Sequence, residues 1–190
     1  MTSATQILRQ EHETILEMIG ALEAIVHQLE TGGAIPVETL NRLTEFFVLF
    51  ADRSHHGKEE DLLFPLMERR GVPRAGGPLG CMLAEHDEGR GYIRAMKESA
   101  GGCAQAEGAA RSQWANAARG YATLLRNHIW KENEILFQIA ERVLSPADQS
   151  ELARQFAQVQ QEKLDSETET RLAESVRKMR KEFAAMSVAM

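Results

Sequence analysis

Cysteine is scarce in this sequence: Cys81 and Cys103 are the only two among 190 residues. Two cysteines are too few for a disulfide framework, and these two lie too far apart for a redox CxxC motif. We therefore expect both to be reduced and structural.

Long apolar runs are also missing. No segment approaches the roughly 20 consecutive apolar residues that a membrane-spanning helix needs, so a membrane is excluded as an expected partner. The first residues, MTSATQILRQEHE, lack the basic stretch and apolar core of a secretory signal. The expected location is the cytoplasm.

An excess of positive charge is the third absence. The formal net charge is −6, and the one dense basic cluster, residues 177–181, lies among acidic residues. Proteins that bind phosphate backbones gather lysine and arginine on one surface. No nucleic-acid partner is expected.

What the sequence does contain is helical periodicity. Glycine and proline gather in short clusters, and between these clusters inward positions recur at alternate steps of four and three residues. The pattern covers residues 5–30, 37–69, 79–98 and 111–143. Four amphipathic helices joined by short loops predict an all-α, antiparallel up-down-up-down four-helix bundle over residues 1–144.

Residues 145–190 are predicted to form a helical extension. Ser145-Pro146, followed by Asp148, is typical of a helix start. A polar break from Asp165 to Thr170 precedes a last amphipathic helix. The apolar positions of the two helices are Leu152, Phe156 and Val159, then Leu172, Val176, Met179, Phe183 and Met186. This extension is expected either to cover the bundle or to pair with a second subunit in a homodimer.

Six polar residues interrupt the inner stripes of the four predicted helices. They are His12, then His55 and Glu59, then His86, then His128 and Glu132. Each half of the chain thus offers a lone histidine followed by an HxxxE pair, at nearly the same separation. The neighbouring residues repeat as well. A glutamate directly precedes the lone histidine in both halves, and the segment HHGKE of the first half matches HIWKE of the second. The bundle is therefore interpreted as two similar hairpins related by a pseudo-twofold axis.

The spacing of these residues is that of metal ligands. Side chains four apart share a helix face, so each HxxxE pair presents an imidazole and a carboxylate to one small volume. Burying an unpaired carboxylate costs several kcal/mol, on the order of 3 to 5, and only Arg90 is close enough in register to compensate. We predict two metal ions bridged by the two carboxylates. The ExxH motif of ferritin-like bundles and the HExxH motif of zinc proteases are absent, and manganese or zinc would suit the donors as well as iron.

Over roughly residues 5–144 the sequence resembles hemerythrin-like proteins, the HHE cation-binding domains. The matching text is EH at Glu11, HHGKEEDLLFP from His55, EHDEGR from Glu85 and HIWKENEILF from His128. The resemblance implies a non-haem di-iron centre with an oxo or hydroxo bridge. It assigns His12 and His55 to one iron, His86 and His128 to the other, and Glu59 and Glu132 to both.

Residues beside these ligands have less definite roles. Oxygen-carrying hemerythrins have a fifth histidine one turn after the third, where this sequence has Arg90, which either contacts an exogenous ligand or forms an ion pair. Tyr121 is either a donor near the site or a core residue. Glu60, four residues after His56, competes with Glu59 as a ligand, but the repeat favours Glu59. His27 and His56 fall outside the inner stripes and are predicted to be solvated.

The leading functional interpretation is a di-iron protein that binds or senses oxygen or nitric oxide, or that handles iron. The alternative is a di-iron enzyme that acts on peroxide or nitric oxide. A third, regulatory interpretation has the terminal helices report the iron state to a partner. Because Arg90 stands where oxygen-carrying hemerythrins have the fifth histidine, the resemblance implies a site less suited to reversible oxygen carriage and more like those of relatives that handle iron, nitric oxide or peroxide.

Overall fold

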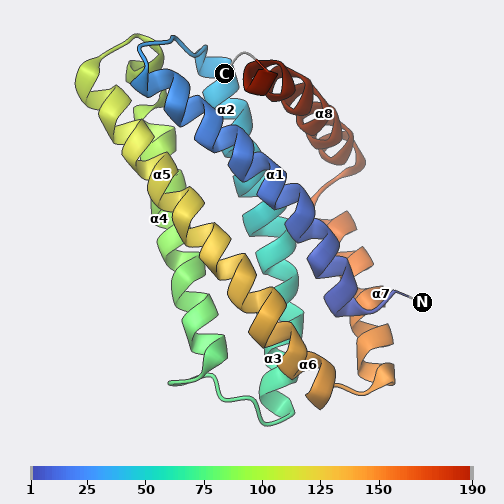
Figure 1. Ribbon diagram of the computed structural model, residues 1–190. Coiled ribbons are helices and arrows are strands. Elements are labelled where there is room, and N and C mark those ends of the chain that lie inside the picture. The colour runs from blue at the N-terminus through green and yellow to red at the C-terminus, as the bar shows by residue number, and fades with distance from the viewer. Residues whose placement is uncertain (1, 189–190) are drawn as a thin grey trace.

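The computed structural model describes residues 2–188, with side chains described as far as Phe183, and these residues contain no β-strand. Met1, the side chain of Met186 and residues 189–190 lie outside the described part. Long helices run antiparallel to one another in a bundle, and the C-terminal helices lie along one side of it (Figure 1). The predicted all-α bundle with a helical extension is confirmed.

The first helix, α1 (Ala4–Glu30), begins at a capping box in which Ser3 and Gln6 satisfy each other's backbone N–H groups. The second helical column of the bundle is one unbroken run of helical turns. It consists of α2 (Val37–Phe46), η1 (Phe47–His56), η2 (Glu59–Leu63) and α3 (Phe64–Arg69). The third is α4 (Pro78–Ala104). The fourth runs through α5 (Gly108–Lys131), η3 (Glu132–Leu136) and α6 (Phe137–Val143). The segments η1, η2 and η3 have the wider turns of a π-helix.

The third helix extends further than predicted. It was expected to end at residue 98, before a glycine pair, but α4 continues to Ala104. Ala100 and Cys103 are buried in the bundle, whereas Gly101 is exposed. Burial of the first two side chains outweighs the cost of about 1 kcal/mol that each glycine imposes on a helix.

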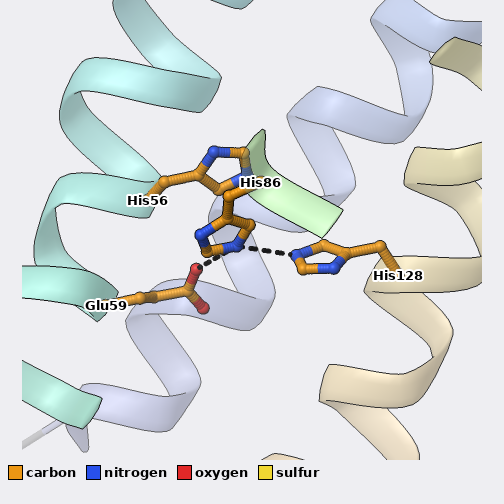
Figure 2. A group of neighbouring side chains, drawn as sticks. All are labelled: His56, Glu59, His86 and His128. Carbon is orange, nitrogen blue, oxygen red and sulfur yellow. Dashed lines mark hydrogen bonds and ion pairs between the residues drawn. The ribbon is translucent and has the colours of Figure 1, made fainter. Parts of the chain in front are cut away.

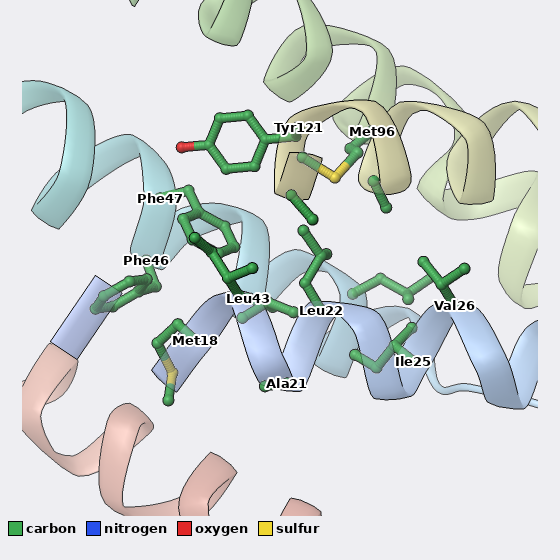
Figure 3. Packing of buried hydrophobic residues seen from close by; sticks show 14 of the residues in the cluster. Met18, Ala21, Leu22, Ile25, Val26, Leu43, Phe46, Phe47, Met96 and Tyr121 are labelled. Carbon is green, nitrogen blue, oxygen red and sulfur yellow. The ribbon is translucent and has the colours of Figure 1, made fainter. Parts of the chain in front are cut away.

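A polar layer divides the apolar core into two clusters. The larger cluster contains Ile15 of α1, Ala51 of η1, Ile93 of α4 and Leu125 of α5, and Figure 3 shows part of its packing. The smaller one lies beyond the polar layer on the same four helical columns. Its members there are Leu8, Leu63, Met82 and Leu136. The predicted ligands therefore lie in a polar layer between two apolar clusters.

The π-helical turns shift the register of two columns below this layer. A regular repeat of four and three residues counted on from His55 and His128 would place Leu62, Leu66 and Ile135 inward, but Leu62 and Leu66 are only half-buried and Ile135 is 46% exposed. The next residue along the chain is fully inside in each case, at Leu63, Met67 and Leu136. A wide turn adds a residue to the helical repeat, so every side chain after it moves to a new angular position.

The extension packs against its own bundle. The helix α7 (Pro146–Lys163) begins at a Ser145–Asp148 capping box and inserts Leu152 and Phe156 into the smaller core cluster. The helix α8 (Ser166–Val188) starts within the predicted polar break, because the Asp165 side chain accepts from the Thr168 N–H and caps it. Its buried residues Val176, Met179 and Phe183 join the larger cluster. A homodimer through these helices stays a prediction.

Two further expectations concern the exterior and the cysteines. None of the described helices combines the length and apolar character that crossing a bilayer requires. Both cysteines are free, with Cys103 buried and Cys81 exposed.

Candidate metal centre

The six predicted ligands come together in the polar layer. One group consists of His12, His55, Glu59 and Glu132, with one donor atom from each lying within 4.8 Å of the others. A second group with the same property consists of His56, Glu59, His86 and His128 (Figure 2). Glu59 belongs to both groups, so the two candidate sites are adjacent.

The carboxylates lie between histidines from the two halves of the chain. Oε1 of Glu59 lies 3.7 Å from Nε2 of His55, and Oε2 lies 3.6 Å from Nε2 of His86. Glu132 repeats the arrangement, with Oε2 at 3.1 Å from His12 and Oε1 at 3.3 Å from His128. One oxygen of each carboxylate thus faces each half, as a bridging ligand requires.

Each of these four imidazoles is held from behind through its Nδ1–H group. The accepting oxygens are Asn133 Oδ1 for His12 at 2.9 Å, Glu11 Oε2 for His55 at 2.8 Å, Glu60 Oε1 for His86 at 2.7 Å and Glu85 Oε2 for His128 at 2.8 Å. A proton on Nδ1 leaves the Nε2 lone pair of the neutral ring directed at the interior. Metal-binding histidines in proteins are oriented by such partners.

The repeated EH and HxxKE segments of the sequence account for two of these contacts. Glu11 and Glu85 directly precede a lone histidine, yet each hydrogen-bonds the HxxxE histidine of its own hairpin. The lysine three residues after that histidine, Lys58 or Lys131, donates to the same carboxylate. The EH and HxxKE segments are thus one structural unit that occurs twice.

Nε2 of His86 and Nε2 of His128 lie 3.0 Å apart and hydrogen-bond each other, but most other polar atoms in the interior of the layer have no such partner in the part of the chain that the structure describes. Among the described residues, none bonds either oxygen of Glu59 or Glu132, or Nε2 of His12 or His55. Both carboxylates are fully buried. Such groups are costly unless a cation offsets them, and imidazole with carboxylate is a donor set for transition metals. The residues present therefore fit bound metal ions.

Burial and mutual repulsion set the protonation of the layer. Burial, followed by the charge of Glu132, raises the pKa of Glu59 well above its usual value. Burial lowers the pKa of His55 to about 4, with repulsion from His12 adding to it. Burial also acts to lower the pKa of His128, but Glu132 and Glu85 outweigh it and raise that pKa to about 9.

His56 was missed by the sequence reasoning. It is 4% exposed, so the prediction that it is solvated was wrong, whereas His27 is exposed as expected. Its ring stacks on that of His86 with centroids 3.8 Å apart. The doublet His55-His56 was the available signal, because both imidazoles face inward at the end of the π-helical segment η1. The second group thus has three imidazoles and the first has two.

Arg90 forms ion pairs at the edge of the second group. Its guanidinium donates to Asp52 Oδ1 at 2.8 Å, to Glu60 Oε1 at 2.7 Å and to Asp87 Oδ1 at 2.8 Å. The first two of these carboxylates also accept from imidazoles of the second group. Arg90 therefore braces the partners of those histidines.

Tyr121 lies in the larger apolar cluster, on one side of the polar layer. It is 1% exposed, and its ring meets Phe47 edge-on with centroids 4.9 Å apart (Figure 3). Burial raises the pKa of its hydroxyl, with the charge of Asp52 adding to the effect. The hydroxyl has no hydrogen-bond partner among the described residues, so its contacts are those of a core tyrosine.

Comparison with known proteins identifies the family. A family model described as the hemerythrin HHE cation binding domain matches residues 3–140. The chain belongs to this family. As an HHE cation-binding domain with buried histidine and glutamate groups, it has a metal-binding site.

Curated relatives of this HHE domain include the iron-sulfur cluster repair protein YtfE of Yersinia pseudotuberculosis serotype IB (strain PB1/+) and that of Yersinia pestis. Each is 28% identical over 141 residues, which is 72% of this chain and 63% of the relative. The chain thus spans less than two thirds of the length of these relatives. No solved structure gives a significant match.

Proposed function

We propose that the chain holds two iron ions in the polar layer. His12 and His55 bind one ion, His86 and His128 bind the other, and Glu59 and Glu132 bridge them. His56 adds a third nitrogen to the second ion. The observation that carries this assignment is the pair of fully buried carboxylates, each with one oxygen facing a histidine of each half and none hydrogen-bonded within the described chain.

Bound iron would supply Lewis acidity and one-electron redox chemistry. The chain's own residues prepare the site for it. Hydrogen bonds at Nδ1 fix the imidazole orientations, and the two apolar clusters exclude bulk water from above and below. An oxo or hydroxo bridge between the ions is part of the proposal.

The role we infer is iron handling, with oxygen or nitric oxide as candidate small ligands. The relatives are named for iron-sulfur cluster repair, and this supports a task centred on iron. The asymmetry of three imidazoles against two supports ions of unequal affinity, as a protein that releases or accepts iron would need. The small ligand is tested by exposing the iron-loaded chain to oxygen, azide and nitric oxide and following absorption.

Metal content tests the centre itself. An anaerobic Fe(II) titration should end at two ions per chain, and the double variant Glu59→Ala with Glu132→Ala should bind less than one. Glu134→Ala, an exposed glutamate in the same π-helical segment, is the matched control and should leave the end point unchanged. Less than one iron in the unaltered chain, or unchanged content in the double variant, would refute the proposal. Parallel titrations with manganese and zinc decide the identity of the metal.

The enzymatic alternative is turnover of peroxide or nitric oxide. It predicts steady-state consumption by the iron-loaded chain that Glu132→Ala abolishes. Absence of metal-dependent turnover leaves binding or iron handling. The cytoplasmic location is likewise a proposal, which cell fractionation tests.

A further inference from the structure

A chain of hydrogen bonds connects one metal-layer histidine to the C-terminal extension. His55 donates from Nδ1 to Oε2 of Glu11, and Lys58 donates from Nζ to Oε1 of the same carboxylate. Lys58 also donates to Oε1 of Gln160 in α7 at 3.2 Å. Gln160 in turn donates from Nε2 to Glu169 of α8. Both helices of the extension therefore contribute to this chain.

Lys58 is an unusual lysine, because its side chain is only 1% exposed. Among the described residues, Glu11 and Gln160 are the hydrogen-bond acceptors of its ammonium group. A buried charge must be paired and hydrogen-bonded, so each acceptor matters to its position. Gln160 is the acceptor that the bundle itself does not supply.

The other half of the bundle has the same unit without the extension. Lys131 donates to Glu85, which accepts from His128 at 2.8 Å. The Lys131 side chain is 28% exposed, so water can complete its hydrogen bonds. The internal repeat thus offers a built-in comparison for the effect of α7.

The end of α7 lies over the ligand-bearing segment. Lys163 pairs with Asp61 of η2 at 2.8 Å, and a Cβ atom on Gly57 would lie 3.1 Å from its Nζ. Phe156, one turn before Gln160, is buried in the smaller apolar cluster. These contacts place Gln160 beside Lys58, whose ammonium group donates to the side-chain amide oxygen of Gln160.

We propose that Gln160 is a positioning residue for the metal centre and acts through Lys58 and Glu11 on His55. The C-terminal extension thereby adjusts the ion held by His12 and His55 and leaves the ion held by His86 and His128 unchanged. The orientation and donor strength of a ligating imidazole depend on the carboxylate behind it. The position and basicity of the Glu11 carboxylate depend in turn on how Lys58 shares its hydrogen bonds between Glu11 and Gln160.

The test compares three variants of the extension. Gln160→Met keeps the length of the side chain and removes the acceptor. The double variant Gln160→Glu with Glu169→Gln restores an acceptor oxygen for Lys58 and exchanges donor and acceptor at the contact between residues 160 and 169. Gln158→Met is the matched control, since Gln158 is exposed on the same helix and, among the described residues, its side chain bonds Glu162 alone. Should the methionine variant unfold, Gln160→Ala removes the same acceptor without adding apolar bulk.

The first measurement needs no metal. Imidazole proton–nitrogen correlations of the histidine-labelled, metal-free chain report the Nδ1–H groups of His55 and His128. We expect Gln160→Met to shift the His55 signal, Gln160→Glu with Glu169→Gln to restore it, and neither to move the His128 signal. An unchanged His55 signal, or equal changes at both histidines, would overturn the proposal.

The second measurement rests on the proposed di-iron function. In an anaerobic Fe(II) titration, Gln160→Met should weaken one of the two binding steps by roughly tenfold, the lower end of the range for residues behind a metal ligand. Equal weakening of both steps would mark a general structural effect and contradict the proposal. If the unaltered chain binds no iron, the proposed function fails, and the imidazole signals still decide whether Gln160 positions His55.

Discussion

Oε2 of Glu85 lies 2.8 Å from Nδ1 of His128, the same distance that separates Glu11 from His55 in the other half of the bundle. Burial acts to raise the pKa of Glu85, but the hydrogen bonds from His128 and Lys131 outweigh it and lower that pKa to about 2. The carboxylate is thus held ionised behind the histidine that the metal would use.

This depressed pKa predicts a loss of stability in acid. A carboxylate with a lower pKa in the folded chain stabilises it fully above the unfolded value near 4.5, and the contribution disappears as the pH falls from 4.5 towards 2. We expect Glu85→Gln to remove about 1 kcal/mol of this dependence, a small figure because solvent reaches part of the group. Urea unfolding of the metal-free chain at several pH values measures it, with the exposed Glu13→Gln as control. Equal acid sensitivity of Glu85→Gln and the unaltered chain would contradict the assignment.

Metal uptake should release protons. Burial and the charge of Glu132 raise the pKa of Glu59, so this carboxyl keeps its proton to a higher pH than usual in the metal-free chain. Glu132 and Glu85 raise the pKa of His128 to about 9, so its ring carries a second proton near neutral pH. Ligands must lose these protons to bind an ion. The affinity for iron should therefore rise between about pH 7 and 9, and the share of the release due to His128 should vanish above pH 9.

Calorimetry in buffers of different ionisation enthalpy counts the protons. Glu134→Gln changes an exposed carboxylate in the same segment and should leave the count unaltered. An affinity that does not vary across this range would show that the layer is already deprotonated without metal.

Much of the architecture follows from helical periodicity alone. Between Leu8 and Leu29 in α1, every position selected by alternate steps of four and three residues is buried, and the same holds between Leu79 and Met96 in α4 when the steps alternate from three. Both helices are regular, so a constant repeat describes them. The same repeat placed His12 and His86 on the inner faces because each lies in phase with its apolar neighbours.

The predictions failed where the repeat is not constant. The π-helical turns that carry Glu59 and Glu132 add a residue locally, which turned Ile135 outward and brought Leu136 inside. Nothing in the residue types of these turns distinguishes them from an ordinary helix. The packing of a buried polar layer decides them, and that information is tertiary.

The residues that hydrogen-bond the Nδ1 atoms of the histidines could not be predicted from the sequence either. Asn133 holds His12 across the bundle, and Glu60 holds His86, although neither pair is close in sequence. The repeat of EH and HxxKE signalled that these letters belong together. It did not reveal that Glu11 serves His55 rather than its neighbour His12, since this depends on how the helices face one another.

His56 provides a direct test of the asymmetry between the two groups. His56→Leu keeps a similar side-chain volume and removes the third imidazole of the second group. The affinity for one ion should therefore fall by more than about tenfold, while the affinity for the other ion stays unchanged. An anaerobic Fe(II) titration resolves the two steps. His27→Leu is the control, because His27 is exposed. Two unchanged steps in His56→Leu would exclude this histidine from the centre.

The paired glycines near the end of α4 give opposite predictions for stability. A Cβ atom on Gly101 meets nothing within 4 Å in the described chain, so Gly101→Ala should stabilise the protein by about 0.5 to 1 kcal/mol through helix propensity. A Cβ atom on Gly102 would lie 2.7 Å from the Cβ atom of Ala110, which is fixed to the backbone of α5. Forcing these helices apart should cost about 1 to 3 kcal/mol, more than the same propensity gain returns. Urea unfolding of the two variants measures the difference, and equal stabilisation by both would show that the α4–α5 turn is less closely packed than described.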